Sequence, residues 1–352
     1  MKKLSFLTAL LWFCFTSESN ATQWSVSNSP ANPGQFASIQ AALDAPNVMP
    51  GDTLLIQPTP IRHPDFELTK RLVFIGGGHS TSHSPGQITT LTRVYVSSLA
   101  NAAAASGSKF YGMRMSFFRS WFHNGNVSDI SFENVLFDCL HCPNESGIQF
   151  SGGSKPVNML IKNCNFQSCT YDAPINFEQY GSTGTASSVT ILNTVFSNCG
   201  QQSIESFKGV LLVSNCTFLT TNPIYDVKYA TFQNCIFNEG TFNANVTDNV
   251  FNNCIAKDSS LPPAGNTGAN NISNTAVIFV PNTLMLAPTS PGYTGGNDGT
   301  QMGVYGGGGN YSSSGEPLNS PIIRNLNIKN ITIAQNGNLT IDLLATKPLK
   351  TN

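Results

Sequence analysis

The sequence predicts an all-β fold in which short strands wind into a solenoid of the parallel β-helix type. The first observation is a phrase, Asn-x-x-Phe, that recurs between Ile130 and Cys254, usually with a cysteine beside it. The second is that short apolar runs with strand-like alternation accompany each phrase. The third is that no helical stripe of useful length lies between them. Such recurrence is typical of a solenoid, in which each repeat buries its apolar face against its neighbours.

Six copies of the phrase define the repeat, and successive Phe residues are 14 to 30 residues apart. The copies are Asn134/Phe137, Asn163/Phe166, Asn193/Phe196, Asn215/Phe218, Asn234/Phe237 and, with Asp in the Asn place, Asp248/Phe251. We expect the Phe side chains to stack inside the solenoid. We expect the Asn residues at a bend, because Asn tolerates left-handed φ. A leucine-rich repeat, the rival solenoid, needs a denser Leu pattern.

The composition and the N-terminus indicate an exported protein. The chain has 352 residues, 11% of them charged, and a formal net charge of −1. It has no basic cluster beyond its N-terminus, so nucleic acid is not an expected partner. Residues 1–21 resemble a signal peptide, with Lys2 and Lys3 before an apolar run; the alternative is an uncleaved anchor. No later segment is apolar enough to cross a membrane, so we expect a secreted or cell-surface location.

The cysteines of the predicted mature chain all lie in the repeat zone and fall into two groups. One group recurs at 30-residue intervals, with Cys254 in a similar place: Cys139, Cys169 and Cys199. The other directly follows the repeat Asn: Cys164, Cys216 and Cys235. Since residues at one register of a solenoid stack, we expect ladders of buried thiols, some of them bridged between coils. The single Cys139-x-x-Cys142 pair is weak evidence for a metal.

Two terminal regions resemble a known family. A short helix over Ser38–Leu43 precedes a strand over Gly51–Ile56 and the phrase Lys70–Gly78, which ends in three glycines. This order resembles the start of right-handed parallel β-helix proteins of the pectin-lyase-like superfamily, and residues 298–307 resemble their closing segment. The resemblance implies that the helix plugs the first coil. It also implies that catalytic relatives cleave acidic polysaccharides with Asp clusters, often with calcium, and an Arg or Lys base.

The phrases of the standard pectin enzymes are absent from this chain. It contains neither a Gly-His-Gly nor an Arg-x-Pro-x-x-Arg phrase, and no Asp-Asp pair. We place the β-helix at residues 22–310, with a late strand at Ala276–Val280. We assign residues 311–352 to a C-terminal β-hairpin tail, because alternating runs flank Asn336-Gly337-Asn338.

One face of the predicted solenoid offers a candidate site. A strand with an inward Ile recurs after each turn, which places the following residue outward. The predicted substrate-binding residues are Gln149, Asn176, Tyr180, Tyr225 and Asp226. The predicted catalytic residues are Glu178, Glu205 and Lys208. Adjacent coils are about 4.8 Å apart, so Glu178 and Glu205 are expected close enough to share a proton or a cation.

The sequence leaves two functions open. The first is an exported protein that binds polysaccharide along this face; if it is an enzyme, it is a polysaccharide lyase or a glycoside hydrolase. The second is a non-catalytic cell-surface, adhesion or structural protein, because outward residues on any solvated sheet are polar. We expect a monomer and no metal site, and the sequence identifies no cofactor. His63 and His79 are expected in solvated loops.

Overall fold

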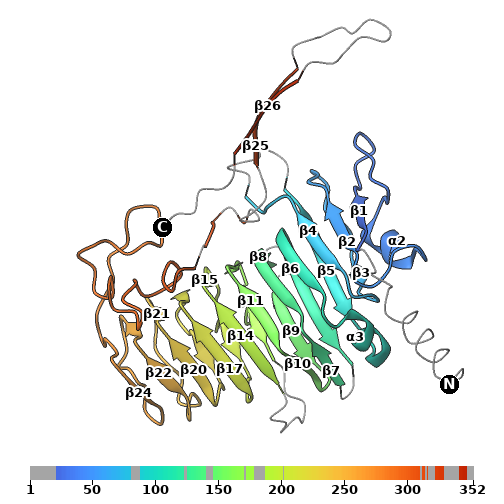
Figure 1. The fold of residues 1–352 in the computed structure, drawn as a ribbon. Helices are drawn as coiled ribbons and strands as arrows, with labels where there is room; N and C mark the ends of the chain where they lie inside the picture. Colours follow the sequence, from blue (N-terminus) through green and yellow to red (C-terminus); the bar gives the residue numbers. More distant parts are fainter. Residues whose placement is uncertain are drawn as a thin grey trace, which may run out of the picture.

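The chain winds into a parallel β-helix whose coils stack from β1 to β24 (Figure 1). The computed structural model describes residues 21–80, 88–122, 125–139, 146–169, 172–177, 187–200, 202–309, 311–313, 315, 322–328 and 341–346. The strands of the coils pair in parallel with strands of the neighbouring coils, which confirms the predicted all-β solenoid. The predicted signal peptide lies almost entirely outside these residues. Neither described helix has the length and apolar character needed to cross a membrane.

The first face is one continuous parallel sheet along the whole solenoid. Its strands, in pairing order, are β1 (Gln23–Val26), β2 (Thr53–Ile56), β4 (Val73–Gly76), β6 (Lys109–Trp121), β8 (Ser131–Asp138), β11 (Met159–Lys162), β14 (Ser188–Leu192), β17 (Val210–Ser214), β20 (Ala230–Gln233), β22 (Val250–Asn252) and β24 (Thr267–Ala269). The long strands β6 and β8 continue round the corners and also contribute to other faces.

The second and third faces complete each coil. The second face contains β5 (Thr90–Val96), parts of β6 and β8, β12 (Asn165–Gln167), β15 (Val195–Ser197), β18 (Thr217–Leu219), β21 (Ile236–Phe237) and β23 (Ile255–Ala256). The third face contains β3 (Phe66–Glu67), the ends of β5 and β6, β9 (Ile148–Ser151), β13 (Ile175–Asn176), β16 (Ile204–Glu205) and β19 (Ile224–Tyr225). A separate short pair joins β7 (Gly125–Ser128) to β10 (Ser154–Val157).

Two short helices pack against the N-terminal coils. Helix α2 (Ile39–Asp44) begins where the Ser38 hydroxyl accepts a hydrogen bond from the Ala41 amide, and its apolar face joins the core, as predicted. Helix α3 (Leu99–Ala105) was not expected from the sequence, because its alanines form no clear amphipathic stripe. Its Ser98 cap before an Ala-rich run is the signal that indicates it.

The core consists of stacked aromatic columns. The repeat phenylalanines lie face to face in successive coils, with ring centroids 4.6–5.1 Å apart: Phe137, Phe166, Phe196, Phe218 and Phe237. They are buried, and each stacked pair contributes about 0.5–1.5 kcal/mol beyond burial of its area. Met115 pairs with Phe137 and continues the column towards the N-terminus.

The repeat asparagines form the bend between the first and second faces. Asn134, Asn163, Asn193, Asn215 and Asn234 all have φ between 45° and 54°. This is the left-handed region that Asn tolerates. Gly112 has φ 63° and takes the same place one coil earlier. The predicted role of the repeat Asn is therefore confirmed for these copies.

The sixth predicted copy of the repeat phrase, Asp248/Phe251, is assigned to the wrong register. Phe251 pairs with Phe232 on the first face, so it does not belong to the column of repeat phenylalanines. Asp248 occupies a different bend, which is also left-handed with φ 62°. Asn253 and Ala256 hold the Asn and Phe places in this coil, since Ala256 pairs with Phe237. The phrase cannot separate the two bends because both favour Asn or Asp.

One cysteine column follows the repeat Asn and consists of free buried thiols. Its members are Cys164, Cys216, Cys235 and Cys254. Each Sγ lies 3.4–3.7 Å from a carbonyl oxygen of the preceding coil. Cys254 therefore belongs here and not with Cys199, which corrects the sequence prediction. Burial raises the pKa of the Cys164 thiol to about 12, so this thiol stays protonated.

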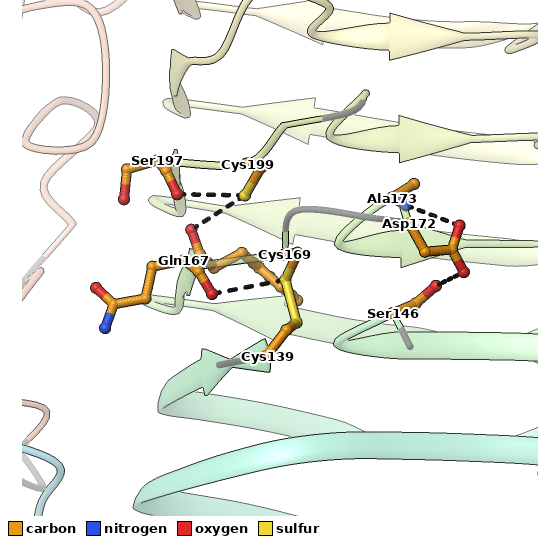
Figure 2. Close-up of a disulfide and its surroundings, with 9 residues drawn as sticks. Cys139, Ser146, Gln167, Cys169, Asp172, Ala173, Ser197 and Cys199 are labelled. Atoms are coloured by element: carbon orange, nitrogen blue, oxygen red, sulfur yellow. Dashed lines mark hydrogen bonds between the residues drawn. A yellow bond between two sulfur atoms is a disulfide. The ribbon is translucent and has the colours of Figure 1, made fainter. Parts of the chain in front are cut away.

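The second cysteine column lies after the second face. Cys139 and Cys169 form a disulfide between successive coils, and Cys199 remains a free, buried thiol (Figure 2). The three side chains pack together as one cluster. The expected ladder with a bridge between coils is therefore confirmed for this column. Cys142 lies outside the described part of the chain.

Residues 276–309 and 311–313, here called the return segment, run back along the outer surface of the second face. The Val304 amide donates to Thr217 Oγ1 at 3.0 Å, and Asn193 Nδ2 donates to the Val304 carbonyl at 3.0 Å. Met302 packs with Ile236, and Val304 packs with Val195. The return segment therefore buries outward apolar residues of the second face, among them Val195 and Ile236, unlike an ordinary solvated sheet.

The predicted late strand at Ala276–Val280 is not a strand. This stretch belongs to the return segment, where Phe279 makes only an isolated bridge to Leu286. Its side chains pack instead against the outer surface at β21 and β23, since Val277 and Phe279 contact the cluster around Ile236. An apolar run can thus cover a sheet without joining one.

The C-terminal tail contains an antiparallel hairpin, as predicted. Strand β25 (Ile322–Ile328) pairs with β26 (Ile341–Thr346). In Figure 1 this hairpin stands away from the stacked coils. The turn predicted at residues 336–338 lies outside the described residues.

Candidate functional site

The third face brings several predicted site residues into one outward column. Ile148, Ile175, Ile204 and Ile224 pair with one another and are buried. The next residue in each strand points outward, which gives the series Gln149, Asn176, Glu205 and Tyr225. The predicted alignment of these four residues is confirmed.

The same column extends further towards the N-terminus than the sequence indicated. Pairing of β6 with β9 places Arg119 beside Gln149, and Tyr95 and Glu67 follow in β5 and β3. We call the series Glu67, Tyr95, Arg119, Gln149, Asn176, Glu205 and Tyr225 the strip. The three added residues lack the Ile-x pattern, because β5 and β6 enter the third face without a new turn.

An exposed aromatic residue lies beside the strip at Arg119. The guanidinium carbon of Arg119 is 5.0 Å from the centroid of the Trp121 ring, and Trp121 is 59% exposed. This cation–π contact holds the Arg119 side chain against a ring. Trp121 is two residues after Arg119 on the same strand, so it presents its apolar surface beside this part of the strip.

The middle of the strip is closed to solvent. Gln149 is 8% exposed and Asn176 only 6%. Asp172 fixes Asn176, since its Oδ1 accepts from Asn176 Nδ2 at 3.0 Å. Its Oδ2 accepts from Ser146 Oγ at 2.7 Å (Figure 2). Within the described residues, Asn176 Oδ1 and Arg119 Nε are buried without a hydrogen-bond partner. These atoms keep unused hydrogen-bonding capacity.

The C-terminal half of the strip is more open. Glu205 and Tyr225 are half-buried, and Lys208 Nζ lies 3.2 Å from Asp226 Oδ2 of the next coil. Both side chains of this ion pair are about one-third exposed, so it contributes at most about 1 kcal/mol. The Lys208 ammonium is therefore held by a carboxylate beside the strip. Asp226 itself sits at a left-handed bend, with φ 47°.

Tyr229 adds an exposed ring at the edge of this open half. It is 65% exposed and has φ 64°, a conformation that is rare for a bulky residue. The register places it beside Val210 of the preceding coil, which is also exposed.

The predicted carboxylate pair is not placed by the structure. Glu178 and Tyr180 lie outside the described residues, and the residue that pairs with Glu205 in the preceding coil is Asn176. The catalytic roles of Glu178, Glu205 and Lys208 therefore stay predictions, as do the binding roles of Tyr180 and Asp226.

The sequence prediction that His63 and His79 lie in solvated loops is wrong, because both side chains are buried. Burial lowers the pKa of His63 and, with a smaller contribution from Arg114, lowers the pKa of His79 to about 4. The backbone at Gly315 packs directly on the His79 ring and leaves no room for a side chain. The chain beyond the return segment thus helps to bury His79.

We expect His79 to destabilise the protein as the pH falls from about 6.5 to about 4. In this range the unfolded chain binds a proton on His79 and the folded chain does not. Each pH unit therefore lowers the free energy of unfolding by about 1.4 kcal/mol, or about 3 kcal/mol over the whole range. Urea unfolding of the wild type and His79→Gln across this range isolates the effect. Equal pH dependence of the two proteins contradicts it.

The assignment of the strip depends on register, burial and contacts within this chain. The columns of Phe, Asn and Ile residues set its position on the third face. In comparisons with known proteins, no family model, no curated protein and no solved structure matches this chain.

Proposed function

We propose that this protein is exported and binds polysaccharide along the strip as a monomer. The observation that supports this most directly is the column of outward polar and aromatic side chains, one in each coil, ending in the open pair Glu205 and Tyr225. A polymer of sugar units presents hydroxyl groups at ring edges and C–H groups at ring faces. The half-buried carboxylate and aromatic side chains of the strip, such as Glu205 and Tyr225, offer complementary contacts.

Export has two lines of support. Residues 1–21 have the charged start and apolar run of a signal peptide. The Cys139–Cys169 disulfide suits an oxidising compartment outside the cytosol. The resemblance of the N-terminal region to the pectin-lyase-like superfamily adds support for a polysaccharide ligand. That superfamily assignment is itself part of the proposal.

A second candidate function is a non-catalytic surface or adhesion scaffold. The β25–β26 hairpin favours it, because the hairpin stands apart from the coils in Figure 1. A two-stranded hairpin alone is marginally stable in water, so such an element gains from a partner surface. In this function the strip binds no ligand.

The test is a glycan-array and polysaccharide-depolymerisation screen of the full chain, with and without calcium. We expect Tyr225→Ala to weaken binding about tenfold, since an aromatic contact contributes on the order of 1–1.5 kcal/mol. The matched control is Tyr293→Ala, which removes a ring that is 39% exposed on the return segment. If Tyr225→Ala binds polysaccharide as well as the wild type does, the strip is not the binding site.

The same screen separates binding from cleavage. A lyase product absorbs in the ultraviolet, and its appearance would identify turnover. Glu205→Gln and Lys208→Met are then expected to lower the rate while leaving binding within a few-fold. Binding without turnover supports a carbohydrate-binding scaffold. The absence of both binding and cleavage for every polysaccharide in the screen favours the adhesion function.

A further inference from the structure

The second cysteine column contains one more thiol than its disulfide uses. Cys139, Cys169 and Cys199 come from three successive coils and pack in one buried cluster. Figure 2 shows them one above another, with Cys169 in the middle. Cys169 is bonded to Cys139, and Cys199 is free. Cys169 therefore has a second cysteine on its other side.

In backbone register, Cys169 matches Cys199 more closely than it matches Cys139. Phe137, Phe166 and Phe196 align, yet Cys139 comes two residues after its Phe, whereas Cys169 and Cys199 come three residues after theirs. The residues just before the latter two cysteines, Ser168 and Asn198, have similar left-handed φ values of 62° and 51°. The chain thus follows the same path into Cys169 and Cys199.

The spacing of the coils suits a bridge between either pair. The Cα atoms of Cys139 and Cys169 are 4.9 Å apart. The Gly200 amide donates to the Cys169 carbonyl at 3.1 Å, so the next coil is held in register immediately after Cys199. Neighbouring strands lie about 4.8 Å apart, which is within the Cα separation of about 4.4–6.8 Å that a disulfide needs. A Cys169–Cys199 bridge therefore requires no change in the path of the backbone.

We propose that Cys199 is a resolving thiol, and that the disulfide has two positions, Cys139–Cys169 and Cys169–Cys199. The Cys199 thiolate attacks Sγ of Cys169, which forms the new S–S bond. The bond from Cys169 to Cys139 breaks, and Cys139 leaves as a thiolate that takes up the proton released from Cys199. No oxidant is consumed, since one disulfide and one thiol are present before and after.

The stacking of the three sulfur atoms favours this exchange. Thiol–disulfide exchange proceeds by attack of a thiolate on one sulfur while the other leaves. In the column, the attacking and leaving cysteines lie on opposite sides of Cys169. Burial raises the pKa of Cys199 to about 11, so few molecules carry the thiolate at neutral pH. We therefore expect the exchange to accelerate about tenfold per pH unit between pH 7 and pH 9.

The position of the bridge bears on the strip. Asp172, which holds Asn176 and Ser146, comes three residues after Cys169. One bridge ties this corner to the preceding coil and the other ties it to the following coil. The inference rests on the thiols alone, so it does not depend on whether the strip binds polysaccharide.

The first experiment maps the bridge in the full chain carrying Cys142→Ser. The protein is incubated at pH 9 with a trace of reduced glutathione, quenched in acid, alkylated and analysed by peptide mass spectrometry. We expect both bridged peptides, with Cys139 alkylated in the molecules that contain Cys169–Cys199. Recovery of the Cys139–Cys169 peptide alone would overturn the proposal.

The second experiment removes the leaving cysteine. Cys139→Ser in the same background is treated with oxidised glutathione, and circular dichroism checks that it is folded. We expect a Cys169–Cys199 bridge, while Cys216 and Cys235 stay reduced as buried controls in the same sample. Free thiols at both Cys169 and Cys199 in the folded variant would contradict the inference. The matched variant Cys199→Ser is expected to keep only the Cys139–Cys169 bridge.

Discussion

Phe196→Ala is expected to lower the free energy of unfolding by about 3–5 kcal/mol. Phe196 is fully buried, and its ring stacks 5.1 Å from Phe166 and 4.8 Å from Phe218. The change removes the buried area and leaves a cavity that neighbouring coils cannot fill, because hydrogen bonds along the sheet hold their spacing. Urea unfolding followed by circular dichroism measures the loss.

Two further variants define what the Phe column contributes. Phe196→Leu keeps an apolar side chain and loses the two ring stacks, so we expect a loss of only about 1–2 kcal/mol. Val210→Ala, at an exposed position on β17, is the control and should change stability by less than about 0.5 kcal/mol. If Phe196→Ala costs no more than Val210→Ala, the column does not stabilise the solenoid.

Arg114→Met is expected to cost about 3–5 kcal/mol, because it removes the Arg114 cation from a buried carboxylate. Arg114 on β6 forms an ion pair with Asp138 on β8, and the Asp138 side chain is only 2% exposed. The ion pair crosses between neighbouring coils just before Cys139. A carboxylate buried this deeply is not solvated by water, so water cannot replace the lost interaction with Arg114. Chemical unfolding at pH 7 measures the effect.

The double variant Arg114→Met/Asp138→Leu separates the ion pair from simple packing. Removing both charges eliminates the buried carboxylate, so we expect the double variant to regain more than half of the stability that Arg114→Met loses. The control is Lys162→Met, which breaks the exposed ion pair with Glu133 and should cost at most about 1 kcal/mol. Additive losses in the double variant are the result that argues against a buried-charge penalty.

The repeat phrase predicted the interior well because each of its parts has a local physical cause. Asn adopts left-handed φ at a bend, as Asn134 and Asn234 do, and Phe at a fixed distance after it turns inward. The prediction failed where two bends share that preference. Asp248 and Asn253 are both left-handed, and only strand pairing shows which one continues the column.

The candidate site was predictable only in part. An inward Ile at the start of each short strand was enough to align Gln149 with Tyr225 across the intervening coils. Arg119 was missed because β6 runs through three faces with no turn residue to mark the third. The pairing of Lys208 with Asp226 was also not predicted, since it joins side chains of two coils whose relative offset depends on the bends between them.

The sequence by itself determined the type of coil, the composition of its interior and the column that forms the strip. Each of these follows from preferences that act within a few residues. Only the tertiary structure decided what covers the outside of the coils: the return segment over the second face, the burial of His79 and the closed middle of the strip. These depend on contacts between distant segments, such as Asn193 with Val304, which are 111 residues apart. No local pattern specifies such a contact, because its energy arises only when the coils have already stacked.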